Sequence, residues 1–211
     1  MLKYTKDQNK ENILLDSNNE QVMMEWEKPY MEACINMLKP KGDVLEIGFG
    51  MGYSATAIQK YNPKSHTIIE CDPIVISKCK KWSKKYNNVN IIEAKWQDVI
   101  CTDQLKTYNE VFFDDFPNNI TNLTELEKIQ TITRIYLFID FIHQYHLKKN
   151  SKISAYLCEN ESMSNHPIWK SKFIDNPNWE YTEKFINIKI SNIQKYHKSN
   201  NKAIIPLLKL V

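Results

Sequence analysis

The residues best suited to chemistry lie where a short apolar run ends in a turn rich in glycine. Residues 44–47 are mostly apolar, and three of the chain's four glycines follow at alternate positions, as Gly48, Gly50 and Gly52. Glycine adopts sharp backbone turns and lets a ligand approach the main chain closely. Glu70 ends the next predicted strand about 20 residues on, the separation at which folds of this kind bind ribose hydroxyls. This spacing predicts a nucleotide-like ligand at the turn.

The spacing of the glycines indicates which kind of nucleotide-like ligand the turn would bind. Dinucleotide-binding turns read G-x-G-x-x-G and place a pyrophosphate on the following helix. A phosphate-binding P-loop needs a Lys followed by Ser or Thr. This chain has G-x-G-x-G instead, preceded by Glu46 inside the strand. That variant favours S-adenosylmethionine, with S-adenosylhomocysteine as the product, over NAD. A tight strand-to-helix turn without any ligand is the alternative.

Strands and helices alternate along the chain on both sides of this turn. Apolar runs predict strands at 44–47, 67–71, 89–93, 111–113 and 153–157, followed by a hairpin of 185–190 and 204–208. Helical patterns cover 21–38, 54–60, 73–86 and 124–147, and 96–99 is a loop or a short helix. This order predicts an α/β fold with a seven-stranded, mostly parallel Rossmann-like sheet that ends in an antiparallel C-terminal hairpin.

Polar and aromatic side chains follow several of these strands. Glu70 follows the second strand, Trp96 and Gln97 the third, and Asp114 the fourth. Because ligands bind at the carboxyl ends of parallel strands, we expect these side chains to meet in one crevice. Trp96 offers an apolar surface to adenine, and Gln97 and Asp98 can receive the adenine amino group.

Two carboxylates without a neighbouring base stand after the strand at 111–113. Asp114 and Asp115 precede Phe116 and Pro117. An acceptor held there has to be cationic or rich in N–H donors, and a planar guanidinium matches paired carboxylates. For Asp115, a turn-forming role before the proline is the alternative.

Several segments resemble the motifs of guanidinoacetate N-methyltransferase. Residues 21–31 resemble V-M-x-x-W-E-x-P-Y-M, 46–51 E-V-G-F-G-M, 66–71 H-x-I-I-E-C, 95–99 W-E-D-V, 113–117 Y-D-T-Y-P and 204–207 I-T-P-L. The resemblance is shared with a fungal protein-arginine methyltransferase that modifies the delta nitrogen of arginine. It implies a class I methyltransferase fold, S-adenosylmethionine as methyl donor and a guanidino group as acceptor.

The resemblance also implies which residues carry the reaction. In the family a glutamate and an aspartate grip the guanidino group, and the matching positions here are Glu27 and Asp114. Asp114 is the expected base because it ends a rigid strand. The donor site is implied to contain Met23, Met31, Phe49, Gly50, Met51, Glu70, Cys71 and Trp96. Glu46, Gly48, Gly52 and Gln97 complete the expected donor site.

Two residues that depart from the family motifs stand at positions expected beside the donor and the acceptor. Gln97 replaces an acid expected beside adenine, although its amide carbonyl can accept the same hydrogen bond. Asp115 replaces a threonine next to the acceptor, and its added charge would repel the carboxylate of guanidinoacetate. The expected function is methyl transfer to the guanidino nitrogen of a small guanidinoacetate-like compound. A protein-arginine N-methyltransferase and a donor-binding module without catalysis are the alternatives.

Composition sets the remaining expectations. Residues 1–20 are polar and predict a flexible arm before a single methyltransferase domain at 21–211. The net charge of +3 comes from scattered lysines with Arg134 as the only arginine, which argues against nucleic acid as a partner. No apolar run reaches about 20 residues, so a membrane span is not expected. Five cysteines without a C-x-x-C pair favour a reducing, cytoplasmic location, and no metal site is expected.

Overall fold

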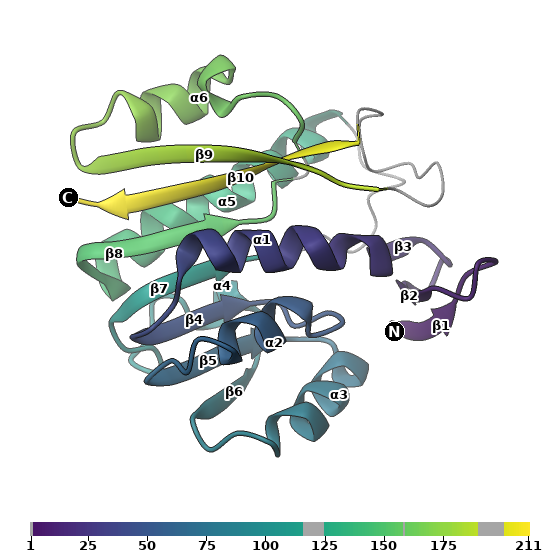
Figure 1. Ribbon diagram of the computed structural model, residues 1–211. Helices are drawn as coiled ribbons and strands as arrows, with labels where there is room; N and C mark the ends of the chain where they lie inside the picture. The colour runs from purple at the N-terminus through teal and green to yellow at the C-terminus, as the bar shows by residue number, and fades with distance from the viewer. Residues whose placement is uncertain (1, 116–124, 158, 190–200) are drawn as a thin grey trace.

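A seven-stranded sheet organises the chain, in the order β6-β5-β4-β7-β8-β10-β9 (Figure 1). Its strands are β4 (Asp43–Ile47), β5 (Ser65–Glu70), β6 (Val89–Glu93), β7 (Tyr108–Phe113), β8 (Leu147–Ala155), β9 (Trp179–Asn187) and β10 (Lys202–Leu210). The computed structural model describes residues 2–115, 125–157, 159–189 and 201–211. β4 to β8 pair in parallel, and β10 runs antiparallel to β8 and β9. The predicted sheet and its C-terminal hairpin are confirmed.

Helices cover both faces of this sheet (Figure 1). One face carries α1 (Lys28–Leu38), α2 (Tyr53–Gln59) and α3 (Pro73–Ser83), and the other α4 (Trp96–Val99), α5 (Glu125–His146), η3 (Met163–Asn165), α6 (Pro167–Trp169) and η4 (Lys170–Ile174). Two separate clusters of buried apolar side chains fill the two layers. All five positions of β4 are buried, because a parallel strand between two helical layers meets no solvent.

The predicted helix at 21–38 is shorter than expected. Residues Gln21–Met24 form strand β3, Glu25–Glu27 form the 3-10 turn η1, and only then does α1 begin. Pro29 lies in the first turn of α1, where its missing N–H would have no helical partner. The proline therefore marks the start of the helix. Thr124, Phe116, Pro117, Cys158 and Ile190, which also entered the sequence-based expectations, lie outside the described residues.

The N-terminal segment forms a small sheet where a flexible arm was expected. Strands β1 (Lys3–Lys6) and β2 (Asn12–Leu15) pair with each other and with β3 in antiparallel fashion. Leu14 is fully buried, and the Tyr4 hydroxyl donates to the Gly50 carbonyl oxygen at 2.6 Å. The boundary expected at residue 20 thus falls inside the β2–β3 hairpin. The reason is tertiary: a short apolar run in a polar segment is buried by contacts made far along the chain.

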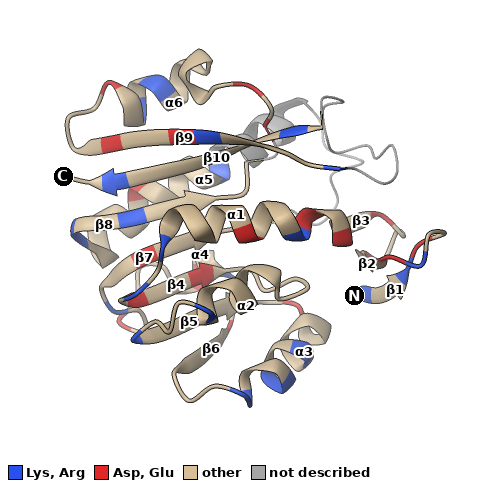
Figure 2. Ribbon diagram, in the orientation of Figure 1, with Lys and Arg blue, Asp and Glu red and all other residues tan. Residues whose placement is uncertain are grey.

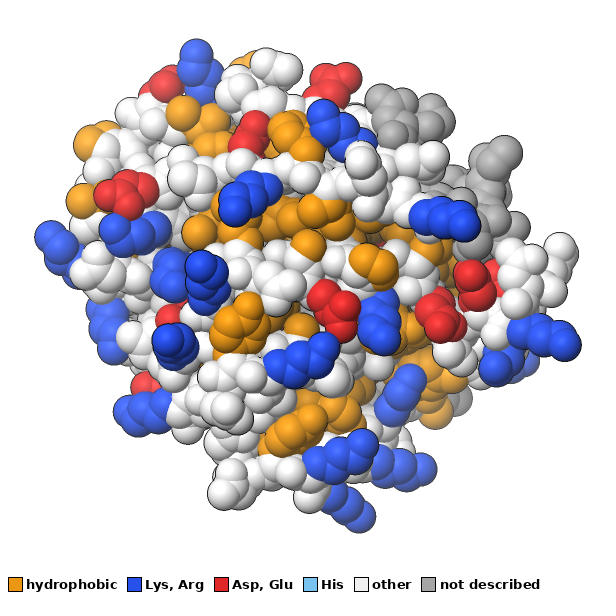
Figure 3. Space-filling model, viewed as in Figure 1, with side chains coloured by type: hydrophobic (Ala, Val, Ile, Leu, Met, Phe, Trp, Pro, Cys, Tyr) orange, Lys and Arg blue, Asp and Glu red, His pale blue; other side chains and the backbone are white. Residues whose placement is uncertain are grey.

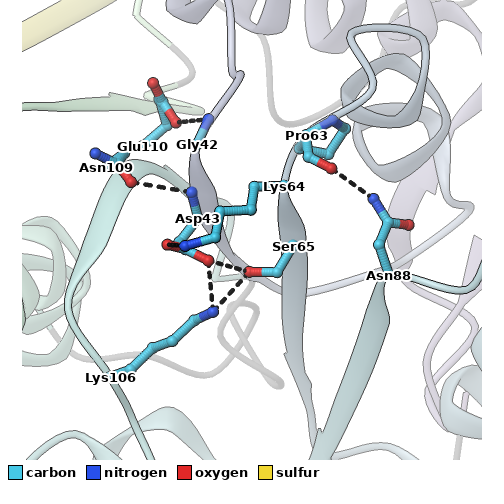
Figure 4. A network of polar contacts seen from close by, with 9 residues as sticks. All are labelled: Gly42, Asp43, Pro63, Lys64, Ser65, Asn88, Lys106, Asn109 and Glu110. Atoms are coloured by element: carbon cyan, nitrogen blue, oxygen red, sulfur yellow. Dashed lines mark hydrogen bonds and ion pairs between the residues drawn. The ribbon is translucent and has the colours of Figure 1, made fainter.

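A polar network ties the strands together at the end of the sheet opposite the glycine turn (Figure 4). Asp43 Oδ1 accepts from Lys106 Nζ and from Ser65 Oγ, each at 2.6 Å. The Asp43 amide donates to Asn109 Oδ1 at 3.0 Å, and the Gly42 amide to Glu110 Oε2 at 3.0 Å. Lys106 and Ser65 hold the pKa of Asp43 well below its usual range. The network fixes the register of the central strands from that end.

Charged side chains are mixed over the surface. Figure 3 shows lysines spread over the visible face with acidic residues among them. Within the described ranges, no helix is long and apolar enough to cross a bilayer.

Replacing Asp43 by Asn is expected to lower the free energy of unfolding at pH 7 by about 1–3 kcal/mol, because the partly buried carboxylate loses its charge-assisted bonds. Because the pKa of Asp43 is lower in the folded state than in the unfolded state, its carboxylate stabilises the protein at pH values above the unfolded-state pKa. The difference in the free energy of unfolding between Asp43→Asn and wild type should therefore shrink as pH falls below about 4. Urea unfolding at pH 7 and pH 2.5 measures both. Asp103→Asn, at an exposed position, is the control, and an equal difference at both pH values contradicts the assignment.

Candidate active site

A cavity of about 300 Å³ lies at the carboxyl ends of β4, β5, β6 and β7. It is lined by Leu2, Leu14, Val22, Met23, Ile47, Gly48, Gly50, Ile69, Glu70, Cys71, Asp72, Val75, Ala94, Lys95, Trp96, Gln97, Asp114, Asp115 and Arg134. The crevice expected from the strand order is therefore present, and the N-terminal sheet contributes to its wall. Its size falls within the usual range for sites that bind small molecules.

Gly48 brings the turn after β4 against the end of β7. Its φ is +81°, and a Cβ there would lie 2.2 Å from the Asp114 carbonyl oxygen. The Gly48 amide donates to the Ile69 carbonyl at 2.9 Å, and the Asp114 amide donates to the Ile47 carbonyl at 3.1 Å. No residue with a side chain fits this space, so glycine allows the backbone of the turn and the acid after β7 to form one wall.

Met23 lies over the same turn. Its Sδ accepts from the Met51 amide at 3.2 Å, and a Cβ on Gly50 would come within 2.8 Å of that sulfur. The apolar side chain of Met23 and the bare backbone of Gly50 both face the cavity. Such a surface suits a ligand that has no phosphate to bind.

Glu70 ends β5 with its carboxylate turned back to the main chain. Its Oε2 accepts from the Phe49 amide at 2.9 Å, and its Oε1 from the amides of Cys71 and Asp72 at 2.7 and 2.9 Å. Each carboxylate oxygen can accept two hydrogen bonds, so Oε2 keeps acceptor capacity for a hydroxyl group. The glutamate both fixes the glycine turn and lines the cavity.

Asp115, Trp96 and Arg134 form an ion-paired cluster in the cavity wall. Asp115 Oδ2 accepts from Trp96 Nε1 at 2.6 Å and from Arg134 Nε at 2.9 Å, with a second, short contact from Arg134 Nη2. The charge of Asp115 is therefore balanced and not directed at an acceptor. Sequence reasoning missed Arg134 as a site residue. The sequence contained one signal for this pair: Arg134 is the only arginine of a chain that carries an added acid after β7.

Glu27 and Asp114 are acids whose pKa is raised, in contrast to Asp43. Glu27, in η1, is buried, and its Oε1 accepts from the Met24 amide at 2.8 Å. Burial raises the pKa of Glu27 to about 8, with Asp114 raising it further and the Met24 amide and the Tyr156 hydroxyl opposing the shift. The pKa of Asp114 is raised to about 7, chiefly by burial and then by the negative charges of Asp115, Glu46 and Glu70. Figure 2 shows acidic residues grouped where β3 leads into α1.

Other predicted residues lie near the cavity without lining it. Glu46 is fully buried, and its Oε2 lies 2.8 Å from His66 Nε2, so it belongs to the core of the sheet. Gly52 caps α2 with φ +76°. Met31, Phe49 and Met51 are buried among the apolar side chains of the α1–α3 layer. Glu27 also does not line the cavity, although Asp114 does. Within the described ranges no cluster of side chains with metal-ligating character was found.

The sheet order and the position of the cavity define a class I methyltransferase fold, and comparisons with solved structures agree. The N-methyltransferase NodS from Bradyrhizobium japonicum superimposes with a TM-score of 0.57 at 9% identity, covering 88% of this chain and 96% of that one. The O-methyltransferase TomG from Streptomyces achromogenes, solved in complex with SAM, gives a TM-score of 0.58 at 9% identity, covering 88% and 79%.

Sequence comparison places the chain within a family. The family model described as guanidinoacetate N-methyltransferase matches residues 3–175, so the chain belongs to the guanidinoacetate N-methyltransferase family. Among curated proteins it is similar to protein arginine N-methyltransferase 2 of Candida glabrata, with 43% identity over 120 residues, 54% of this chain. The same protein of Saccharomyces cerevisiae is 39% identical over 110 residues, 48% of this chain. The matched segments span 27% and 26% of those relatives.

Asp114→Asn is expected to stabilise the protein at pH 8 by about 2–4 kcal/mol. The folded-state pKa of about 7 lies well above the ordinary aspartate pKa of 3.8 that the unfolded chain has. Between these values the native state holds a proton that the unfolded state has released, so this acid makes stability fall as pH rises. The amide cannot ionise and removes that cost.

Urea unfolding of wild type and Asp114→Asn at pH 4, 6 and 8 measures the effect, and the two proteins should converge near pH 4. Asp103→Asn serves as the exposed control. A difference that is the same at every pH would contradict the raised pKa.

Proposed function

We propose that this protein transfers the methyl group of S-adenosylmethionine to a guanidino nitrogen. The observation that carries the proposal is the position of Asp114 in the cavity wall together with the buried Glu27, whose pKa is raised by burial and by the charge of Asp114. A cation offsets the charge of both acids, and a planar guanidinium donates forked hydrogen bonds that suit carboxylates. Membership of the family supports the same reaction class.

The side chains and bare backbone that line the cavity suit the chemistry of the donor. Gly48 and Gly50 leave their backbone bare, Glu70 retains acceptor capacity, and Trp96 presents an aromatic side chain. S-adenosylmethionine, when bound, supplies an electrophilic methyl group.

The two acids perform the chemistry that the acceptor requires. A guanidinium is a poor nucleophile because its lone pairs are delocalised. Glu27 orients the group and offsets its charge, while Asp114 at the end of β7 orients the reacting nitrogen and takes up the proton released as the new bond forms. Because the pKa values are about 8 and about 7, acceptor binding near pH 7 should release protons and strengthen as pH rises.

An arginine side chain in a protein is the acceptor we propose first. The curated relatives that match about half of this chain are named protein arginine N-methyltransferases. A small guanidinoacetate-like compound is the second candidate, favoured by the family match. Since Arg134 balances Asp115, the added acid no longer argues against an acceptor that carries a carboxylate.

A transfer assay separates the two acceptors. Radiolabelled methyl from S-adenosylmethionine is offered to guanidinoacetate, longer guanidino acids, free arginine and arginine-containing proteins. Label on protein arginine supports the first proposal, and label on a small guanidino compound supports the second. If the donor binds and no guanidino group is labelled, the proposed reaction is wrong and a binding module without catalysis is favoured.

Asp114→Asn should reduce turnover by about 10²–10⁴, because a positioned base contributes that much to rate. Affinity for S-adenosylhomocysteine should stay within about threefold, since the carboxylate acts on the acceptor. Glu27→Gln should chiefly raise the acceptor KM. Calorimetry and the transfer assay supply both readouts, with Asp103→Asn as the control. Turnover of Asp114→Asn at the wild-type level would sink the assignment of the base.

A further inference from the structure

Tyr156 lies beside Asp114 at the carboxyl ends of two neighbouring strands. The Tyr156 amide donates to the Phe113 carbonyl oxygen at 3.0 Å, and Phe113 is paired with Ala155 in the parallel register of β7 and β8. Phe113 and Ala155 belong to the apolar cluster on the α5 side of the sheet, whereas Tyr156 packs against the cluster on the α1 side. Since side chains alternate along a strand, Asp114 and Tyr156 both leave the sheet on the side of α1, where the charge of Asp114 acts on Glu27.

The Tyr156 hydroxyl is hydrogen-bonded to the Glu27 carboxylate. Glu27 Oε1 also accepts from the Met24 amide at 2.8 Å, and Glu27 is buried. Because an ionised carboxylate can only accept hydrogen bonds, the hydroxyl is the donor in this contact. The carboxylate is therefore held by two elements, the end of β3 and the end of β8. Its two oxygens can accept about four hydrogen bonds, so capacity remains for a guanidinium.

The ring of Tyr156 is itself fixed by Tyr30. The two ring centroids are 5.0 Å apart with an interplanar angle of 47°, within the range of favourable aromatic pairs. Tyr30 is fully buried, and its hydroxyl donates to the Ile204 carbonyl oxygen at 2.5 Å and accepts from the Leu157 amide at 3.4 Å. Tyr30 thus joins α1 to β10 and to the residue after Tyr156, so the Tyr156 hydroxyl meets Glu27 from a defined direction.

We infer that Tyr156 is a positioning residue, whose hydroxyl holds the Glu27 carboxylate beside Asp114 so that both acids meet one guanidinium. The inference rests on the proposed function, because it takes Glu27 as the acid that orients the acceptor. A carboxylate whose direction is fixed before binding loses less conformational freedom when the acceptor arrives. Tyr156 is not among the residues that line the donor cavity, so its effect should be confined to the acceptor.

The hydroxyl should also favour the ionised form of Glu27. Burial and the charge of Asp114 raise the pKa of Glu27 to about 8, while the Met24 amide and the Tyr156 hydroxyl oppose that rise. On α2, burial raises the pKa of Tyr53 to about 12, with Glu27 among the acids that add to the shift, so Tyr53 stays neutral near pH 8. Losing the Tyr156 hydroxyl should therefore raise the pKa of Glu27 further and move acceptor binding to higher pH.

Tyr156→Phe removes the hydroxyl and keeps the ring against Tyr30. Calorimetric binding of guanidinoacetate and of an arginine-containing peptide, with the protein saturated with S-adenosylhomocysteine, tests the inference. We expect the acceptor that binds wild type to bind the variant about 10- to 100-fold more weakly, the effect of losing a hydrogen bond to a charged group. The pH of half-maximal binding should rise by about one unit, while affinity for S-adenosylhomocysteine stays within about threefold.

Glu27→Gln separates positioning from direct contact. If Tyr156 acts through Glu27, Tyr156→Phe should weaken acceptor binding by less than about threefold in the Glu27→Gln background, because the two changes remove parts of one interaction. An undiminished effect there would overturn the positioning role and make Tyr156 a residue that binds the acceptor itself. Tyr61→Phe, which removes a hydroxyl bonded to Asn36 Oδ1 at 2.9 Å, is the control and should change neither the affinity nor the pH profile.

A stability measurement tests the contact without an acceptor. The difference in the free energy of unfolding between wild type and Glu27→Gln, followed in urea from pH 6 to pH 10, reports the folded-state pKa of Glu27. The same comparison made in the Tyr156→Phe protein should place that pKa about one unit higher. A merely structural role for Tyr156 would lower the stability equally at every pH and leave the pKa of Glu27 where it is.

Failure of the inference and failure of the proposed function give different results. An unchanged pKa of Glu27 and an unchanged acceptor affinity in Tyr156→Phe overturn the inference and leave the proposed function standing. If neither guanidino compound binds wild type saturated with S-adenosylhomocysteine, the proposed function fails and takes the positioning role with it, even where the pKa of Glu27 moves as expected.

Discussion

The close approach of two main chains at Gly48 and Asp114 is the constraint on which the rest of the site depends. A Cβ at Gly48 would lie 2.2 Å from the Asp114 carbonyl oxygen, so only glycine lets the ends of β4 and β7 meet. This contact sets the Asp114 carboxyl beside the bare turn. Main-chain bonds from Gly48 to Ile69 and from Asp114 to Ile47 hold the same arrangement. The donor pocket and the proposed base are thus parts of one rigid unit.

The four acids around this unit differ in how the protein compensates the charge of their carboxylates. Backbone amides satisfy Glu70, and Arg134 pairs with Asp115. Glu27 and Asp114 instead have pKa values raised to about 8 and about 7. Within the site, Glu27 and Asp114 are therefore the acids whose ionised form the protein disfavours. An acid whose burial destabilises the free protein is typical of functional sites.

The sequence predicted the sheet well and the edges of the site less well. The strand β4 and the turn after it follow from a local apolar run and clustered glycines, which act at short range. Glu46 is not among the residues that line the cavity. It stands next to the turn in sequence, but it faces away from the cavity to His66 because side chains alternate along a strand. The burial of Leu14 depends on contacts with distant residues, so the N-terminal sheet was also missed.

By itself the sequence determined the fold class, the glycine turn and the residues that follow each strand, because these depend on periodicity and local backbone freedom. Only the tertiary structure decided how the charges pair. Arg134 lies 19 positions from Asp115 in the chain, on α5, and its guanidinium pairs with that acid. Such pairing depends on angles and distances between elements, which no spacing in the sequence encodes.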